Sequence, residues 1–143
     1  MSKRPAKQIV VIEDHPHNME LIRYLLSSRL GMAPVCSAAS GAEFLAWYRA
    51  RSRRSQQRAI DLILLDIQIP HQDGFEVLRM IRAEPGLAQT TVVAVTANVQ
   101  LPILQQAQAA GFDGFIGKPL DPERFPAQVR QMLEQGAPIW SIE

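Results

Sequence analysis

The sequence predicts an α/β protein with a doubly wound parallel sheet of five strands, each followed by a helix. Short apolar runs recur along the chain, and their continuous apolar character is typical of strands buried on both faces of a parallel sheet. Segments with helical spacing of apolar residues lie between these runs. This alternation indicates right-handed crossovers, and the 143 residues fit one domain.

Five apolar runs are expected to form the strands. Three are strong, and the two around residues 35 and 115 are weaker. The runs are 9–12, 35–36, 62–65, 92–95 and 115–116.

The first and fourth helices are expected to end at glycines. Apolar residues at helical spacing between Met19 and Leu30 predict the first helix, and Gly31 follows it. Gly111 follows the fourth helix in the same way. Glycine suits both places because it readily adopts the left-handed conformation that closes a helix.

Capping residues precede the other three helices. Ser40 and Asp73 stand before the second and third helices, and Asp121 precedes Pro122 at the start of the fifth. Pro126 lacks the amide hydrogen that a helix interior needs. We therefore expect the fifth helix to begin late or to kink.

The composition excludes several classes of protein. A hydrophobic fraction of 47% and a charged fraction of 20% argue against disorder, collagen-like repeats and coiled coil. No apolar run reaches the length of a membrane span, and the basic start at Met1 lacks the apolar stretch of a signal peptide. The single cysteine, Cys36, is expected to be a small core residue, and its isolation favours a cytoplasmic location.

Two segments exceed the regular pattern. We expect residues 7–135 to form the domain, 1–6 to be an N-terminal tail and 136–143 a C-terminal tail. Residues 49–58 carry five arginines, which we interpret as a solvated helix end, with a surface for an anionic partner as the alternative. No specific DNA binding is expected, since zinc spacing and a helix-turn-helix pattern are missing. Trp140 favours docking of the C-terminal tail, on the domain or on another subunit, over fraying. Docking on another subunit would form a homodimer.

Polar residues follow four of the expected strands. Glu13 and Asp14 end the first strand, Asp66 the third and Thr96 the fourth, and Lys118 follows the fifth. The carboxyl ends of parallel strands meet at one edge, where such sheets bind ligands. Three carboxylates repel one another there unless a hard cation such as Mg²⁺ neutralises them. A carboxylate beside a cation and a lysine can attack phosphorus and form an aspartyl phosphate.

This arrangement resembles the receiver domain of two-component response regulators. The resemblance covers about residues 7–135 and implies the flavodoxin-like strand order 2-1-3-4-5. The matching features are Glu13-Asp14, Asp66 within the stretch Asp61 to Pro70, Gly74 at the third helix, Thr96-Ala97, and Phe115 with Lys118-Pro119.

The resemblance implies a set of roles at the site. Asp66 would accept a phosphoryl group from a phosphohistidine on a sensor histidine kinase or a histidine phosphotransfer protein. Asp14, Asp66 and the backbone carbonyl of Gln68 would hold Mg²⁺, with Mn²⁺ as an alternative, and Glu13 would act directly or through water. Lys118 would bind the phosphoryl oxygens. The protein would be a regulatory phosphoacceptor and no enzyme beyond its own phosphorylation and slow dephosphorylation.

The resemblance also implies a switch. Thr96 would move to hydrogen-bond the phosphoryl group, and Phe115, where many relatives have tyrosine, would turn inward after it. The Lys118-Pro119 bond is expected to be cis. A downstream protein partner would bind through the fourth helix, fifth strand and fifth helix. Gln68 occupies a position that influences phosphoryl lifetime in the family.

Other functions fit the residues less well. A flavodoxin needs an amide-rich phosphate loop after the first strand, and the acidic pair at Glu13 would repel that phosphate. An aspartyl-nucleophile phosphatase typically has a second aspartate where Gln68 stands. The P-loop signature is missing. The histidines His15, His17 and His71 are interpreted as solvated loop residues in preference to zinc ligands.

How the receiver is used remains open between two forms. It is either a stand-alone, single-domain regulator or a receiver excised from a hybrid histidine kinase or a multidomain regulator. The start at Met1 and the lack of a tag favour the stand-alone form.

Overall fold

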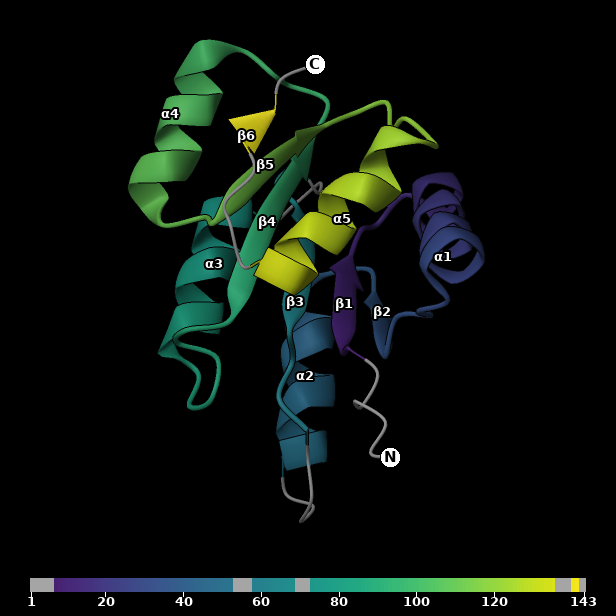
Figure 1. Cartoon of the computed structure of the whole chain (residues 1–143). Coiled ribbons are helices and arrows are strands. Elements are labelled where there is room, and N and C mark those ends of the chain that lie inside the picture. Colours follow the sequence, from purple (N-terminus) through teal and green to yellow (C-terminus); the bar gives the residue numbers. More distant parts are fainter. Residues whose placement is uncertain (1–6, 53–57, 69–72, 136–139, 142–143) are drawn as a thin grey trace.

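A twisted parallel sheet lies between two layers of helices (Figure 1). The computed structural model describes residues 7–52, 58–68, 73–135 and 140–141. Residues 1–6, residues 53–57 of the arginine-rich segment, His71 and most of the C-terminal tail lie outside these ranges. The strands are β1 (Ile9–Ile12), β2 (Cys36–Ala38), β3 (Leu62–Asp66), β4 (Thr91–Thr96), β5 (Gly114–Gly117) and β6 (Trp140–Ser141).

Five helices alternate with the first five strands, as the sequence predicts. They are α1 (Pro16–Leu30), α2 (Gly41–Ser52), α3 (Gly74–Ala83), α4 (Leu101–Ala110) and α5 (Arg124–Gln135). The sheet order β2-β1-β3-β4-β5 is the predicted flavodoxin-like order, and every described pair in it is parallel. The predicted fold class is therefore confirmed.

A sixth strand extends the sheet beyond β5, and the sequence pattern does not predict it. Trp140 pairs with Phe115 and Ser141 with Ile116, in parallel register. The described part of this strand has two residues, too few for an apolar run to stand out in the sequence. Part of the tail thus lies along the edge of β5.

The helix ends follow the predicted capping residues. Gly31 and Gly111 close α1 and α4 with left-handed φ angles of 67° and 102°. The Asp73 side chain accepts from the N–H of Phe75 at 2.9 Å and caps α3. Ser40 Oγ accepts from the N–H of Glu43 at the start of α2.

The fifth helix begins late, as Pro126 predicts. Asp121 Oδ1 accepts from the N–H groups of Glu123 and Arg124, at 2.7 and 2.9 Å, and α5 starts only at Arg124. Pro126 then lies in the first turn, where a missing amide hydrogen removes no intrahelical bond.

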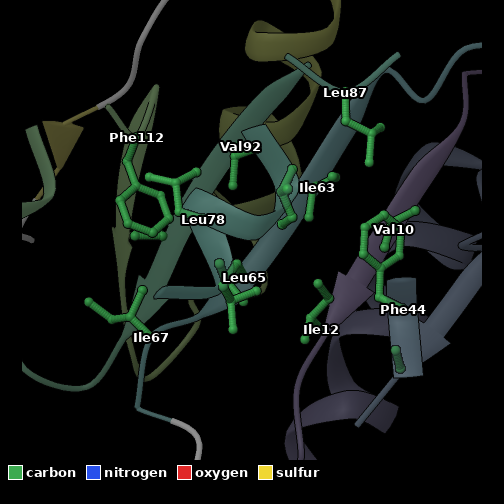
Figure 2. Close-up of a cluster of buried hydrophobic side chains, with 14 of the residues drawn as sticks. Val10, Ile12, Phe44, Ile63, Leu65, Ile67, Leu78, Leu87, Val92 and Phe112 are labelled. Carbon is green, nitrogen blue, oxygen red and sulfur yellow. The ribbon is translucent and has the colours of Figure 1, made fainter. Parts of the chain in front are cut away.

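The core consists of two apolar layers, one on each face of the sheet. Helices α2, α3 and α4 cover one face and α1 and α5 the other. Figure 2 shows part of the first layer, in which Phe44, Leu78 and Phe112 pack beside strand residues such as Ile63 and Leu65. Because both faces of β1, β3 and β4 are covered, their apolar runs are continuous.

The described arginines of the arginine-rich segment contact the domain itself. Arg49 Nε lies 2.6 Å from Glu84 Oε1, and the Arg51 guanidinium lies 5.0 Å from the centre of the Trp47 ring. Arg51 also donates to the carbonyl of Arg58 at 2.7 Å. Both residues lie in the last turn of α2.

Within the described residues, no helix is long and apolar enough to cross a membrane. Cys36 is partly buried against the first core layer, and burial raises the pKa of its thiol to about 11. It therefore stays protonated at neutral pH, as expected of a packing residue.

Candidate phosphoacceptor site

The carboxyl ends of β1 and β3 bring three carboxylates together. One oxygen from each of Glu13, Asp14 and Asp66 lies within 4.8 Å of the others. Glu13 and Asp66 are buried, whereas Asp14 is more exposed. The apolar strands cause this arrangement, since β1 and β3 are neighbours in register and end at the same edge of the sheet. In the described part of the chain, this is the one such group of potential metal ligands.

Lys118 bridges two of these carboxylates. Its Nζ lies 2.6 Å from Glu13 Oε1 and 3.0 Å from Asp66 Oδ2. The side chains are 13%, 1% and 6% exposed for Lys118, Glu13 and Asp66, so the three charged groups interact out of bulk water. The Lys118-Pro119 bond is cis, as expected, and the N–H of Lys118 donates to the carbonyl of Thr96 at 2.8 Å.

Burial and neighbouring charges have opposite effects on the pKa values of Glu13 and Lys118. Burial raises the pKa of Glu13 above its ordinary value, although hydrogen bonds from Lys118 and from the N–H of His15 oppose the rise. Burial on its own would lower the pKa of Lys118, but hydrogen bonds and charges from Glu13 and Asp66 outweigh it and raise that pKa. Lys118 therefore stays charged at neutral pH.

The charges within the cluster do not balance. One ammonium group faces three carboxyl groups, so the site carries excess negative charge when they are ionised. Oxygen ligands at short mutual distances are the donor set that Mg²⁺ and other hard divalent cations prefer. The acidic cluster is therefore suited to a divalent metal ion.

Asp66 is held from two sides. Its Oδ1 accepts from the N–H of Gln68 at 2.8 Å, and its Oδ2 accepts from Lys118. Two donors on different oxygens reduce the freedom of the carboxylate to rotate. The structure thus holds the Asp66 side chain in one orientation at the end of a central strand.

The two residues predicted to form a switch are both fully buried. Thr96 ends β4, and its Oγ1 accepts from the N–H of Asn98 at 3.1 Å. The Phe115 ring lies inside the first core layer on the neighbouring strand β5. The structure thus places the ring in the interior, beside the strand that carries Thr96.

The side chain of Gln68 makes a contact that sequence reasoning missed. Its Oε1 accepts from the N–H of Ala97 at 3.1 Å, across 29 positions in the chain. The sequence shows a polar residue two positions after Asp66 and nothing about the loop it reaches. The rings of His15 and His17 lie 5.6 Å apart, and neither belongs to the metal-ligand group found in the described residues.

Comparison with known proteins decides the family. The family model described as response regulator receiver domain matches residues 9–130. The chain belongs to this family. The predicted resemblance is confirmed, and the chain is a receiver domain of two-component signal transduction. Receiver domains are typically phosphoacceptor regulators and partners of histidine kinases.

Curated relatives of this receiver include long and short proteins. The signal transduction histidine-protein kinase BarA of Escherichia coli is 31% identical over 119 residues, which are 83% of this chain and 12% of the kinase. The chain therefore spans about an eighth of the length of that relative. The polar-differentiation response regulator DivK of Brucella abortus is 30% identical over 133 residues, which are 90% of this chain and 97% of DivK.

Solved structures agree with the fold. A LuxR family DNA-binding response regulator from Silicibacter pomeroyi is 25% identical, with a TM-score of 0.71 over 95% of this chain and 97% of that one. The Mn²⁺-bound form of response regulator Rcp1 is 20% identical, with a TM-score of 0.68 over 92% of this chain and 94% of that one. At that identity the Rcp1 likeness concerns the fold alone.

Proposed function

We propose that Asp66 of this receiver accepts a phosphoryl group from a phosphohistidine on a sensor histidine kinase or a histidine phosphotransfer protein. The observation that carries the proposal is the position of the Lys118 ammonium group between Asp66 and Glu13. A nucleophilic carboxylate, a cation for the phosphoryl oxygens and an acidic metal cluster then share one edge of the sheet.

The transfer follows from the two contacts of Asp66. A carboxylate oxygen of Asp66 forms the bond to phosphorus while the bond from phosphorus to the imidazole nitrogen of the donor breaks. Lys118 exchanges its contact with Asp66 Oδ2 for a contact with a phosphoryl oxygen. Its ammonium group then offsets the negative charge on the phosphoryl group during transfer.

Glu13, Asp14 and Asp66 would hold a divalent cation, Mg²⁺ or Mn²⁺, together with the backbone carbonyl of Gln68. The ion would neutralise the acidic cluster and the phosphoryl oxygens. The close approach of three carboxylate oxygens supports this assignment. Glu13 serves either directly or through a water molecule.

Phosphorylation would shift the population of two conformations of the receiver. Thr96 would leave its bond with the N–H of Asn98 and donate to the phosphoryl group. Phosphorylation would favour the inward position that the Phe115 ring already occupies on the adjacent strand. The surface of α4, β5 and α5 would then bind a downstream protein differently. The domain that carries this switch is proposed to span residues 7–135.

Two uses of the receiver remain candidates. DivK, which matches this chain over nearly its whole length, supports a stand-alone regulator. BarA, of which the matched region is a small part, supports a receiver that belongs to a hybrid kinase. An aspartyl-nucleophile phosphatase is the distant alternative, and Gln68 in place of a second acidic residue disfavours it.

Labelling with acetyl phosphate tests the acceptor. With Mg²⁺ present, the wild-type protein should gain the mass of one phosphoryl group in intact-mass spectrometry, and Asp66→Asn should gain none. Asp73→Asn is the matched control, because its amide oxygen can still cap α3 away from the cluster. Chelation of the metal should abolish labelling. Equal labelling of Asp66→Asn and wild type would overturn the assignment.

A further inference from the structure

A single residue connects the proposed acceptor to the loop that follows β4. The N–H of Gln68 donates to Asp66 Oδ1 at 2.8 Å, while its side-chain Oε1 accepts from the N–H of Ala97 at 3.1 Å. Ala97 directly follows Thr96 in the chain. The bond to Ala97 therefore crosses from the loop after β3 to the loop after β4.

Two hydrogen bonds at Thr96 do not reach the loop after β3. Thr96 Oγ1 accepts from Asn98, and the carbonyl of Thr96 accepts from Lys118 at the end of β5. Gln68, in contrast, ties the loop to the strand that carries Asp66. Its side chain is exposed to solvent, so the amide can exchange Ala97 for water with little loss of packing.

A phosphoryl group on Asp66 would add hydrogen-bond acceptors near the loop after β4. It would bring three strong acceptor oxygens with negative charge. A backbone N–H that serves a neutral amide oxygen forms a stronger hydrogen bond with a charged oxygen. The N–H of Ala97 would then have two competing acceptors.

We propose that the Gln68 side chain is a latch that holds the loop after β4 in the unphosphorylated position. The latch opens when the phosphoryl oxygens compete for the N–H of Ala97, and the loop that carries Thr96 is then free to move. Gln68 is a positioning residue in this scheme, which rests on the proposed phosphorylation of Asp66.

Two substitutions at position 68 separate the amide oxygen from side-chain size. Gln68→Met keeps a similar length and lacks the oxygen, whereas Gln68→Glu keeps an acceptor oxygen and adds charge. Hydrogen exchange at Ala97, followed by NMR without metal or phosphate, should be about two- to tenfold faster in Gln68→Met. Gln68→Glu should retain the wild-type exchange rate within about twofold.

Beryllium fluoride with Mg²⁺, a mimic of a phosphoryl group on a carboxylate, tests the competition. Gln68→Met should bind this probe about two- to tenfold more tightly than wild type, since no amide oxygen occupies the N–H of Ala97. Gln68→Glu should not bind it more tightly, because the acceptor remains and the added charge repels the probe.

The outcomes distinguish this proposal from the proposed function. Unchanged exchange at Ala97 in Gln68→Met would overturn the latch alone. Faster exchange with unchanged affinity for beryllium fluoride would also overturn it, since the bond would then not compete with the ligand. Failure of the wild-type protein to bind the probe would overturn the proposed role of Asp66, and the latch with it.

Discussion

At the scale of single residues, the site depends on the balance between burial and charge at Glu13. A carboxyl group at this depth is costly in its ionised form, and Lys118 offsets part of that cost through a short hydrogen bond. Because the pKa of Glu13 is still raised, burial is the stronger effect in the absence of metal. A bound cation would reverse this balance, since it favours the ionised carboxylate.

The raised pKa of Glu13 predicts a pH dependence of stability. The folded protein binds the Glu13 proton more tightly than the unfolded chain does. The stabilising contribution is therefore complete below pH 4.5, the ordinary pKa of this group, and declines as the pH rises through the raised pKa. In metal-free urea unfolding, the stability of wild type should fall relative to Glu13→Gln across this window. Glu76→Gln, at an exposed position of α3, should show no such trend, and a rise of wild type relative to Glu13→Gln would contradict the prediction.

At the scale of elements, the junction between β3 and α3 positions Asp66. Gly74, the first residue of α3, packs so closely on Ile67 that an added Cβ would lie 2.5 Å from the Ile67 Cα. The neighbour is backbone, which cannot rotate away. The glycine lets the helix start approach the residue that directly follows Asp66.

Substitution Gly74→Ala should therefore destabilise the protein by about 1–3 kcal/mol in urea unfolding, as overpacking typically does. It should also slow labelling of Asp66 by acetyl phosphate, because Ile67 has to shift. Glu76→Ala, an exposed position on the same helix, should change the stability by less than about 0.5 kcal/mol. Equal stability of Gly74→Ala and wild type would show that the junction relaxes without cost.

At the scale of the whole molecule, the strand order assembles the site. Glu13 and Lys118 are 105 positions apart, yet β1, β3, β4 and β5 end at the same edge because all of their pairings are parallel. The side of β5 that faces away from β4 pairs with β6, which comes from the C-terminal tail. That contact covers donors and acceptors of an edge strand that would otherwise be open to pairing with another chain.

Removal of residues 136–143 should affect the pairing of β5 with β6 and leave the acidic cluster intact. Labelling at Asp66 should persist, because no described tail residue takes part in the acidic cluster. Self-association should increase, since truncation opens the edge of β5. Sedimentation velocity over a range of concentrations measures the second effect. Loss of labelling with the fold retained would show that the tail supports the site.

Much of this protein follows from local patterns in its sequence. Continuous apolar runs predict the buried strands, Gly31 and Asp73 predict helix ends, and Pro126 predicts the late start of α5. Polar residues at the strand ends predict which side chains gather. These predictions succeed because each depends on neighbours in sequence or on the rule that parallel strands end at one edge.

The tertiary structure alone decides the contacts between distant segments. The bond from Gln68 to Ala97, the sharing of Lys118 between Glu13 and Asp66, and the pairing of β6 with β5 all join distant parts of the chain. Each depends on side-chain direction or strand register, which residue type does not specify. The sequence by itself determined which chemical groups reach the edge of the sheet, and the packing of the folded chain determined which of them bind one another.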